Sequence, residues 1–171
     1  PFWTLFAAIK ENSMLNKNQE FLLMALAYIE IGKVSAEADT RLKNTFEYQN
    51  AIAYQLYHSV ELFYKYMIEK KEAIEKVHDI AILEKKYRAH FSEERYKIEH
   101  PFDFSSYESC DLNLGEAEMA EAYMQKYKPK FMDQHLRYPR NDNTGGYSYK
   151  VEPCFFDSIK EEMLRISAIE Y

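Results

Sequence analysis

Hydrophobic residues recur along most of this chain at the three- and four-residue steps of an α-helix, not at the alternating steps of a strand. The strongest pattern covers residues 41–70. Two rows of apolar side chains share one face there: Phe46, Ala53, Val60 and Met67 in the first row, and Leu42, Leu56 and Phe63 in the second. An apolar face of this length is typical of a helix that packs along its whole length inside a bundle.

Further helices are predicted on both sides of this central one. A short helix covers residues 2–10. A capping box at residues 16–19 predicts a second helix, which runs through Gly32 as far as Asp39. After the central helix, the pattern predicts another over residues 77–90. Its apolar face consists of Ile80, Leu83 and Tyr87.

The helical pattern fades over residues 91–112, which are predicted to form a loop, and it resumes afterwards. A second capping box at residues 113–116 opens a helix that Pro129 ends. Residues 137–152 are rich in turn signals and predict another loop. Pro153 then stands at the first position of a final helix. The inward side chains of that helix are Phe156, Ile159, Met163 and Ile166.

Five or six helices with short connections predict an all-α fold, an antiparallel helical bundle. The 171 residues contain no inter-domain linker, so we expect one domain over 1–171. Glycine and proline are scarce, at 4 and 5 residues, which disfavours the turn-rich sandwiches and barrels of all-β proteins. Apolar residues make up 47% of the chain, which is enough for a buried core rich in tyrosine and phenylalanine.

The cysteines and the apolar runs indicate the cellular compartment of the protein. Cys110 and Cys154 form no Cys-x-x-Cys pair, so they predict neither a disulfide framework nor a zinc site. The longest apolar run, residues 21–28, is too short to span a bilayer. We therefore expect a cytoplasmic protein with reduced thiols, no bound metal, no cofactor and no membrane partner.

The net charge of −6 disfavours a nucleic-acid binder driven by bulk positive charge, but the charge is unevenly distributed. Residues 126–140 carry five Lys and Arg side chains against a single carboxylate, with aromatic rings among them. Positive charge beside stacking rings suits a nucleotide or a single-stranded nucleic acid. The candidate binding residues are Lys130, His135, Arg137, Tyr138 and Arg140. The alternative is that the rings belong to the core and the cations are merely solvated.

Arg95 and His100 form a candidate catalytic pair, with four residues between them. An arginine can stabilise the charge of a phosphorane, and a histidine can move protons near neutral pH. Such a pair can therefore cleave a phosphodiester. The alternative is that residues 92–100, which are rich in charge, form a solvated surface.

The dipeptide His78-Asp79 allows a third kind of site. Metal-dependent HD phosphohydrolases hold their ion with a His-Asp dipeptide, a second histidine upstream and an aspartate downstream, and His58 and Asp133 would fill those roles here. The competing interpretation is structural: an aspartate at the start of a helix interacts favourably with the helix dipole.

Three motifs occur in an order that resembles the HEPN family (higher eukaryotes and prokaryotes nucleotide-binding). The first is Glu-x-x-x-Lys on the central helix, the second is His-Asp opening a helix with a leucine four residues after the aspartate, and the third is an Arg-Tyr-Pro loop before the last helix. The matching residues are Glu61, Lys65, His78, Asp79, Leu83, Arg137, Tyr138 and Pro139. The resemblance covers residues 40–170. By spacing alone, the Glu-Lys pair could equally be a surface salt bridge.

The resemblance implies a helical bundle that forms a homodimer and acts on nucleotides or RNA. Many HEPN proteins are metal-independent toxin ribonucleases that pair with a small nucleotidyltransferase, in a toxin–antitoxin type of system. Their active site is an Arg-x4-6-His motif at the dimer seam. No histidine follows Arg140 here, and Arg95 and His100 are the pair that matches this spacing. We therefore expect nucleotide or RNA binding, with a non-catalytic dimeric interaction module as the alternative and an HD-type metal phosphohydrolase as the third.

Overall fold

The computed structural model describes residues 17–74, 76–102, 115, 136–138 and 151–169. These residues form four α-helices and one short 3-10 helix, and no strand occurs among them. The all-α prediction is therefore confirmed for this part of the chain. Within the same ranges, no helix combines the length and the apolar character that crossing a membrane requires.

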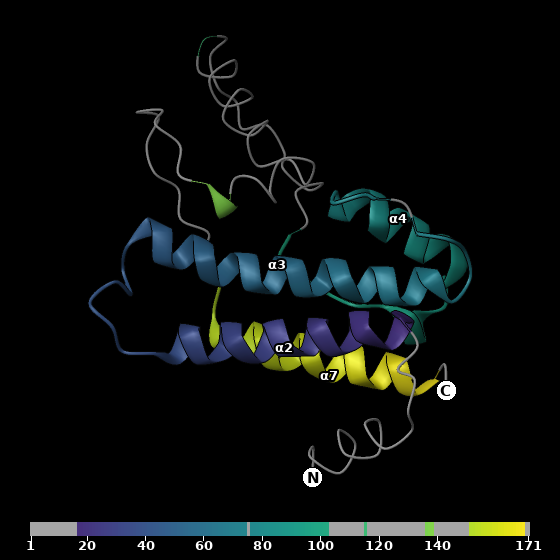
Figure 1. Ribbon diagram of the computed structural model, residues 1–171, viewed down its shortest axis with the longest axis horizontal. Coiled ribbons are helices and arrows are strands. Elements are labelled where there is room, and N and C mark those ends of the chain that lie inside the picture. The colour runs from purple at the N-terminus through teal and green to yellow at the C-terminus, as the bar shows by residue number, and fades with distance from the viewer. Residues whose placement is uncertain (1–16, 75, 103–114, 116–135, 139–150, 170–171) are drawn as a thin grey trace.

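The described helices are α2 (Lys17–Glu37), α3 (Phe46–Glu69), α4 (Ile80–His90) and α7 (Pro153–Ile169), with the 3-10 helix η1 at Glu94–Tyr96. Helix α3 is central and packs against α2 on one side and α4 on another, while α7 lies along α2 (Figure 1). Neighbouring long helices run in opposite directions, as predicted for an antiparallel bundle. The helices predicted over 2–10 and 113–128 lie outside the described residues, apart from residue 115, so their number stays a prediction.

Small residues let α2 approach α3 and α7 closely. The Ser59 hydroxyl donates a 2.8 Å hydrogen bond to the carbonyl oxygen of Ala25 across the α2–α3 contact. Gly32 is buried in the middle of α2, and a Cβ atom added there would lie 2.2 Å from Cε1 of Phe156 and 3.0 Å from Cβ of Gln55. The helix continues through Gly32, as predicted. The missing Cβ of this glycine leaves room for a ring of α7.

The apolar rows of α3 are buried along most of their length, but not at the start. Ala53, Val60, Met67, Leu56 and Phe63 are all fully buried.

The first members of both rows, Leu42 and Phe46, are 57% and 50% exposed, so the prediction that they face the core was wrong. The physical reason is that α3 begins only at Phe46, where the side chain of Thr45 caps it by accepting from the Tyr48 amide. Leu42 lies in the preceding turn, off the buried face.

Helices α4 and α7 follow their predicted faces. Ile80, Leu83 and Tyr87 are the buried residues of α4. Pro153 is the first residue of α7, and its predicted inward side chains, Phe156, Ile159, Met163 and Ile166, are buried. Apolar periodicity therefore predicted the core correctly wherever a helix packs against another helix on one face only.

The close approach at Gly32 predicts that Gly32→Ala destabilises the protein. Replacing glycine by alanine in an exposed helix normally stabilises it by about 1 kcal/mol. Here the new methyl group meets the buried ring of Phe156, and overpacking of this kind costs about 1–3 kcal/mol. Thermal unfolding should therefore show a lower Tm.

Glu37→Ala is the matched control, because Glu37 lies on the same helix, is exposed and, among the described residues, makes only a 3.9 Å surface ion pair with Lys33. Its Tm should change little. A Tm for Gly32→Ala that equals or exceeds the wild-type value would show that α2 and α7 do not approach as closely as described.

Candidate functional site

A fully buried carboxylate, that of Glu61, lies in the middle of α3 and is surrounded by cationic and ring nitrogens. Its Oε1 accepts a 2.5 Å hydrogen bond from Nζ of Lys65 and lies 3.0 Å from Nδ1 of His78. Its Oε2 lies 3.1 Å from Nδ1 of His58. We call these four residues the Glu61 cluster. The carboxylate thus has a partner on each oxygen, as a buried charge requires.

Helix periodicity and one tertiary hydrogen bond bring these side chains together. His58, Glu61 and Lys65 follow each other at three- and four-residue steps, so they share one face of α3. His78 comes from the connection between α3 and α4. The Tyr57 hydroxyl donates a 2.8 Å hydrogen bond to the carbonyl oxygen of His78, which holds that connection against α3.

The surroundings of Glu61 keep its carboxylate ionised. Burial by itself raises the pKa of Glu61, but hydrogen bonds from His58 and Lys65 outweigh burial and bring the pKa below its ordinary value. An ionised carboxylate can only accept hydrogen bonds, so we assign the proton of each neutral imidazole to Nδ1. The other ring nitrogen, Nε2, then carries a lone pair.

The two histidines differ in how far they are exposed. The side chain of His78 is 62% exposed, whereas that of His58 is 19% exposed. The His58 ring is held between two tyrosines: Tyr28 meets it edge-on at 4.7 Å and Tyr54 stacks on it at 5.5 Å between centroids. His78 is therefore accessible to solvent and His58 is packed between two rings, while both contact the same carboxylate.

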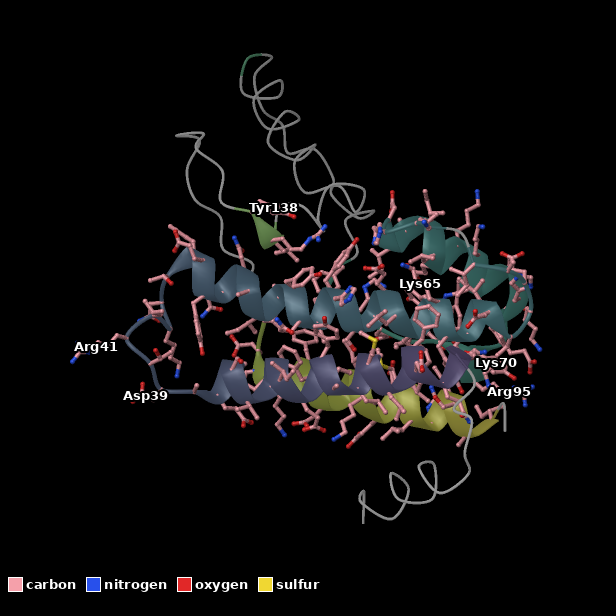
Figure 2. The ribbon with its side chains drawn as sticks, viewed as in Figure 1. Asp39, Arg41, Lys65, Lys70, Arg95 and Tyr138 are labelled. Carbon is pink, nitrogen blue, oxygen red and sulfur yellow. The ribbon has the colours of Figure 1, made fainter. Side chains whose placement is uncertain are left out.

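Tyr54 also connects the Glu61 cluster to Arg137. The guanidinium carbon of Arg137 lies 5.7 Å from the Tyr54 ring centroid and 5.3 Å from that of Tyr138, which are cation–π distances. Tyr138 is 60% exposed. Figure 2 shows Tyr138 and Lys65 on the side of α3 that faces away from α2. His58 lies at the border of this side, because its ring also contacts Tyr28 of α2.

Arg95 and His100, the predicted catalytic pair, have separate surroundings. Arg95 is exposed, pairs with Glu93 at 3.0 Å and lies over the ring of Tyr96. The His100 side chain is only 4% exposed and lies 3.6 Å from Glu84, with its ring against aromatic neighbours. Figure 2 shows Arg95 at the end of the bundle that also carries Lys70, away from Tyr138. Their catalytic role stays a prediction.

Of the predicted binding residues, Arg137 and Tyr138 are described and lie beside the Glu61 cluster. Lys130, His135 and Arg140 lie outside the described residues. The anion-binding role of the stretch 126–140 therefore stays a prediction, with two of its five candidate residues now given a position.

Asp79, the second residue of the possible metal dipeptide, caps α4. Its Oδ1 accepts from the amides of Ala81 at 2.9 Å and Ile82 at 3.4 Å, so the structural interpretation of this residue holds. His58, a proposed ligand, points its Nδ1 at Glu61, and Asp133 lies outside the described residues. In the part of the chain that the structure describes, no three histidine, cysteine or acidic side chains are grouped to hold a metal ion.

The sequence predicted the spacing of Glu61 and Lys65 but not their burial. Their spacing alone is equally compatible with a surface salt bridge, whereas in the structure the Glu61 carboxylate is fully buried and the Lys65 side chain is nearly so. The role of His58 as a second partner of Glu61 and the bridging position of Tyr54 were missed. The signal was present in the sequence: these polar residues recur at helical steps in a helix whose remaining positions are largely apolar.

No protein-family model, curated protein or solved structure matches this chain.

The buried ion pair predicts that Glu61→Ala is strongly destabilising. Removing one partner of a buried pair leaves an uncompensated charge and costs about 3–5 kcal/mol. The control is Lys33→Ala, which breaks the partly exposed Lys33–Asp157 pair at 2.7 Å and should cost less than about 1 kcal/mol. Denaturant unfolding followed by circular dichroism measures both.

A double variant separates lost charge pairing from lost volume. Glu61→Leu with Lys65→Met replaces the pair by apolar side chains of similar size, so much of the lost stability should return. If Glu61→Ala costs no more than Lys33→Ala, the carboxylate is not buried as described.

Proposed function

We propose that this protein is a HEPN-like helical domain that binds a nucleotide or RNA and acts with a small nucleotidyltransferase in a toxin–antitoxin type of system. The observation that carries the proposal is the position of Arg137 and Tyr138 beside Tyr54 and the Glu61 cluster. These residues come from segments far apart in the sequence.

The three motifs of the HEPN resemblance support the proposal because they meet on one side of α3. Glu61 and Lys65 provide the buried pair, and His78 contacts that pair from the next connection. Arg137 and Tyr138 adjoin the same group through Tyr54.

The chemistry of the exposed groups suits a nucleotide. A guanidinium group makes bidentate hydrogen bonds to a phosphate, and stacking on aromatic faces keeps it oriented. An exposed tyrosine offers a flat surface on which a base can stack, and every base has such a face. Arg137 would therefore contact phosphate while Tyr138 contacts a base.

Arg137→Lys should weaken RNA binding about tenfold, because hydrogen bonds to a charged group contribute about 1.5–3 kcal/mol and lysine cannot make the bidentate contact. Titration of a labelled single-stranded RNA at low salt, followed by fluorescence anisotropy, measures the affinity. The wild-type affinity should also fall as salt rises, since each neutralised phosphate releases a counterion.

Arg41→Lys is the matched control, because Arg41 is exposed on the α2–α3 connection at the far end of the bundle from Arg95 (Figure 2). It should leave both affinity and Tm unchanged. A lower Tm for Arg137→Lys with unchanged affinity would assign Arg137 a structural role. Absence of RNA binding by the wild type at low salt would defeat the proposed function.

A dimeric interaction module is the second candidate, and one feature of α2 favours it. Exposed apolar side chains recur on this helix at three- and four-residue steps: Met24, Ala27, Ile31 and Val34. This is the spacing of the a and d positions through which helices pair. The stripe supports assembly of two copies along α2, with or without nucleotide binding.

Ile31→Glu should convert a homodimer into a monomer, because a charge at the centre of the stripe cannot be buried against the same charge from a second copy. Light scattering at micromolar concentration should give twice the 20.4 kDa chain mass for the wild type and a single mass for the variant. Ala51→Glu, at an exposed position of α3, is the control and should stay dimeric. A monomeric wild type contradicts the prediction.

A further inference from the structure

Two histidines direct their ring nitrogens at one buried carboxylate, within the side of α3 that carries Arg137. Nδ1 of His78 and Nδ1 of His58 contact different oxygens of Glu61, so the two imidazoles are neighbours. With each Nδ1 held by the carboxylate, Nε2 lies on the opposite edge of each ring. No described residue makes a hydrogen bond to Nε2 of His78, although that side chain is 62% exposed.

The histidines are more than counter-charges for Glu61. Lys65 already lies 2.5 Å from the carboxylate and neutralises it. What the carboxylate adds to an imidazole is a fixed tautomer and a fixed ring orientation. The same arrangement of a buried carboxylate behind an imidazole orients the general base of hydrolases.

We propose that His78 and His58 form a proton-transfer pair, oriented by Glu61, that cleaves a ribose phosphodiester held by Arg137. This proposal rests on the proposed RNA binding and adds to it the reaction and the residues that carry it. His78 and His58 are the catalytic residues, and Glu61 is a positioning residue.

The reaction balances without a metal, water or a redox partner. Neutral His78 takes the proton of the ribose 2′-hydroxyl at Nε2, and the 2′-oxygen forms a bond to phosphorus. The bond from phosphorus to the 5′-oxygen breaks, and protonated His58 gives its proton to that oxygen. The products are a 2′,3′-cyclic phosphate and a 5′-hydroxyl. Exchange with solvent then restores the two histidines.

The exposures of the two rings match these roles. The His78 side chain is exposed, so a ribose hydroxyl can approach its ring from solvent. The ring of His58 is held edge-on by Tyr28 and face-on by Tyr54, so its orientation is fixed. The guanidinium group of Arg137 lies 5.7 Å from the centroid of the Tyr54 ring, and in the proposed reaction its permanent positive charge stabilises the phosphate charge that develops in the transition state.

The experiment uses a 5′-labelled single-stranded RNA oligonucleotide of mixed sequence, incubated with the full chain in excess EDTA. Wild type should release fragments that end in 2′,3′-cyclic phosphate. His78→Ala should lower the cleavage rate about 100-fold or more, the usual contribution of a general base, while RNA affinity changes less than about twofold. Added imidazole should restore part of the rate.

Three further variants complete the test. His90→Ala is the control, since His90 is exposed on α4 beside Glu72 and should leave the rate unchanged. His58→Ala should lower the rate about as much as His78→Ala. Glu61→Gln should lower kcat more than it changes KM, a split that a purely structural role would not give. A thermal melt of each variant confirms that it is folded at the assay temperature.

Each contrary outcome has a separate meaning. RNA binding by wild type without cleavage in EDTA overturns the proton-transfer pair but leaves the proposed function standing. Cleavage that survives in His78→Ala and is lost in Arg95→Ala or His100→Ala assigns the reaction to that predicted pair instead. Cleavage of an oligonucleotide whose 2′-hydroxyls are replaced by hydrogen also overturns the mechanism. Failure of wild type to bind RNA removes both proposals together.

Discussion

The burial of an ionised carboxylate in the middle of α3 is the constraint on which the functional side of this bundle depends. Taking such a charge out of water costs several kcal/mol unless its oxygens are paired. Lys65 satisfies part of that requirement from the same helix, and His78 satisfies another part from the next connection. The fold of the α3–α4 connection is therefore tied to the charge of Glu61, because moving His78 away would leave an oxygen of a buried carboxylate with fewer partners.

The side of α3 that faces α2 is closely packed. Gly32 and Ser59 keep α2 near α3, and the ring of Phe156 fills the space that the glycine leaves. Closely packed interiors have low compressibility, so α3 is a rigid support. Side chains that must be held within fractions of an ångström are better placed on such a helix than on a loop. The Glu61 cluster therefore borders the close-packed side of α3, where Tyr28 of α2 contacts the ring of His58.

Apolar periodicity predicted the four described α-helices and part of the core, because the side chains that a helix buries on one face recur at helical steps. It missed the buried side chains of Phe91, Tyr96 and Phe102, which lie in a segment predicted to be a loop. The periodicity wrongly assigned Leu42 and Phe46 to the core, because α3 begins only at Phe46 and its start is exposed. The site was harder to predict. The spacing of Glu61 and Lys65 shows that they are neighbours, but their burial depends on contacts from outside their own helix. The approach of Arg137 to Tyr54 joins residues far apart in the chain, and no local pattern encodes it.

The position of Lys65 within the Glu61 cluster explains how one group of residues can serve both stability and proton transfer. A histidine that donates or accepts a proton changes its charge during each cycle. If such a histidine were the sole counter-charge of a buried carboxylate, every deprotonation would leave that carboxylate unpaired and would strain the fold. Lys65 supplies a positive charge on Glu61 throughout. The imidazoles of His58 and His78 can then gain or lose a proton while Glu61 keeps a permanent partner, and their orientation is preserved because the carboxylate stays ionised.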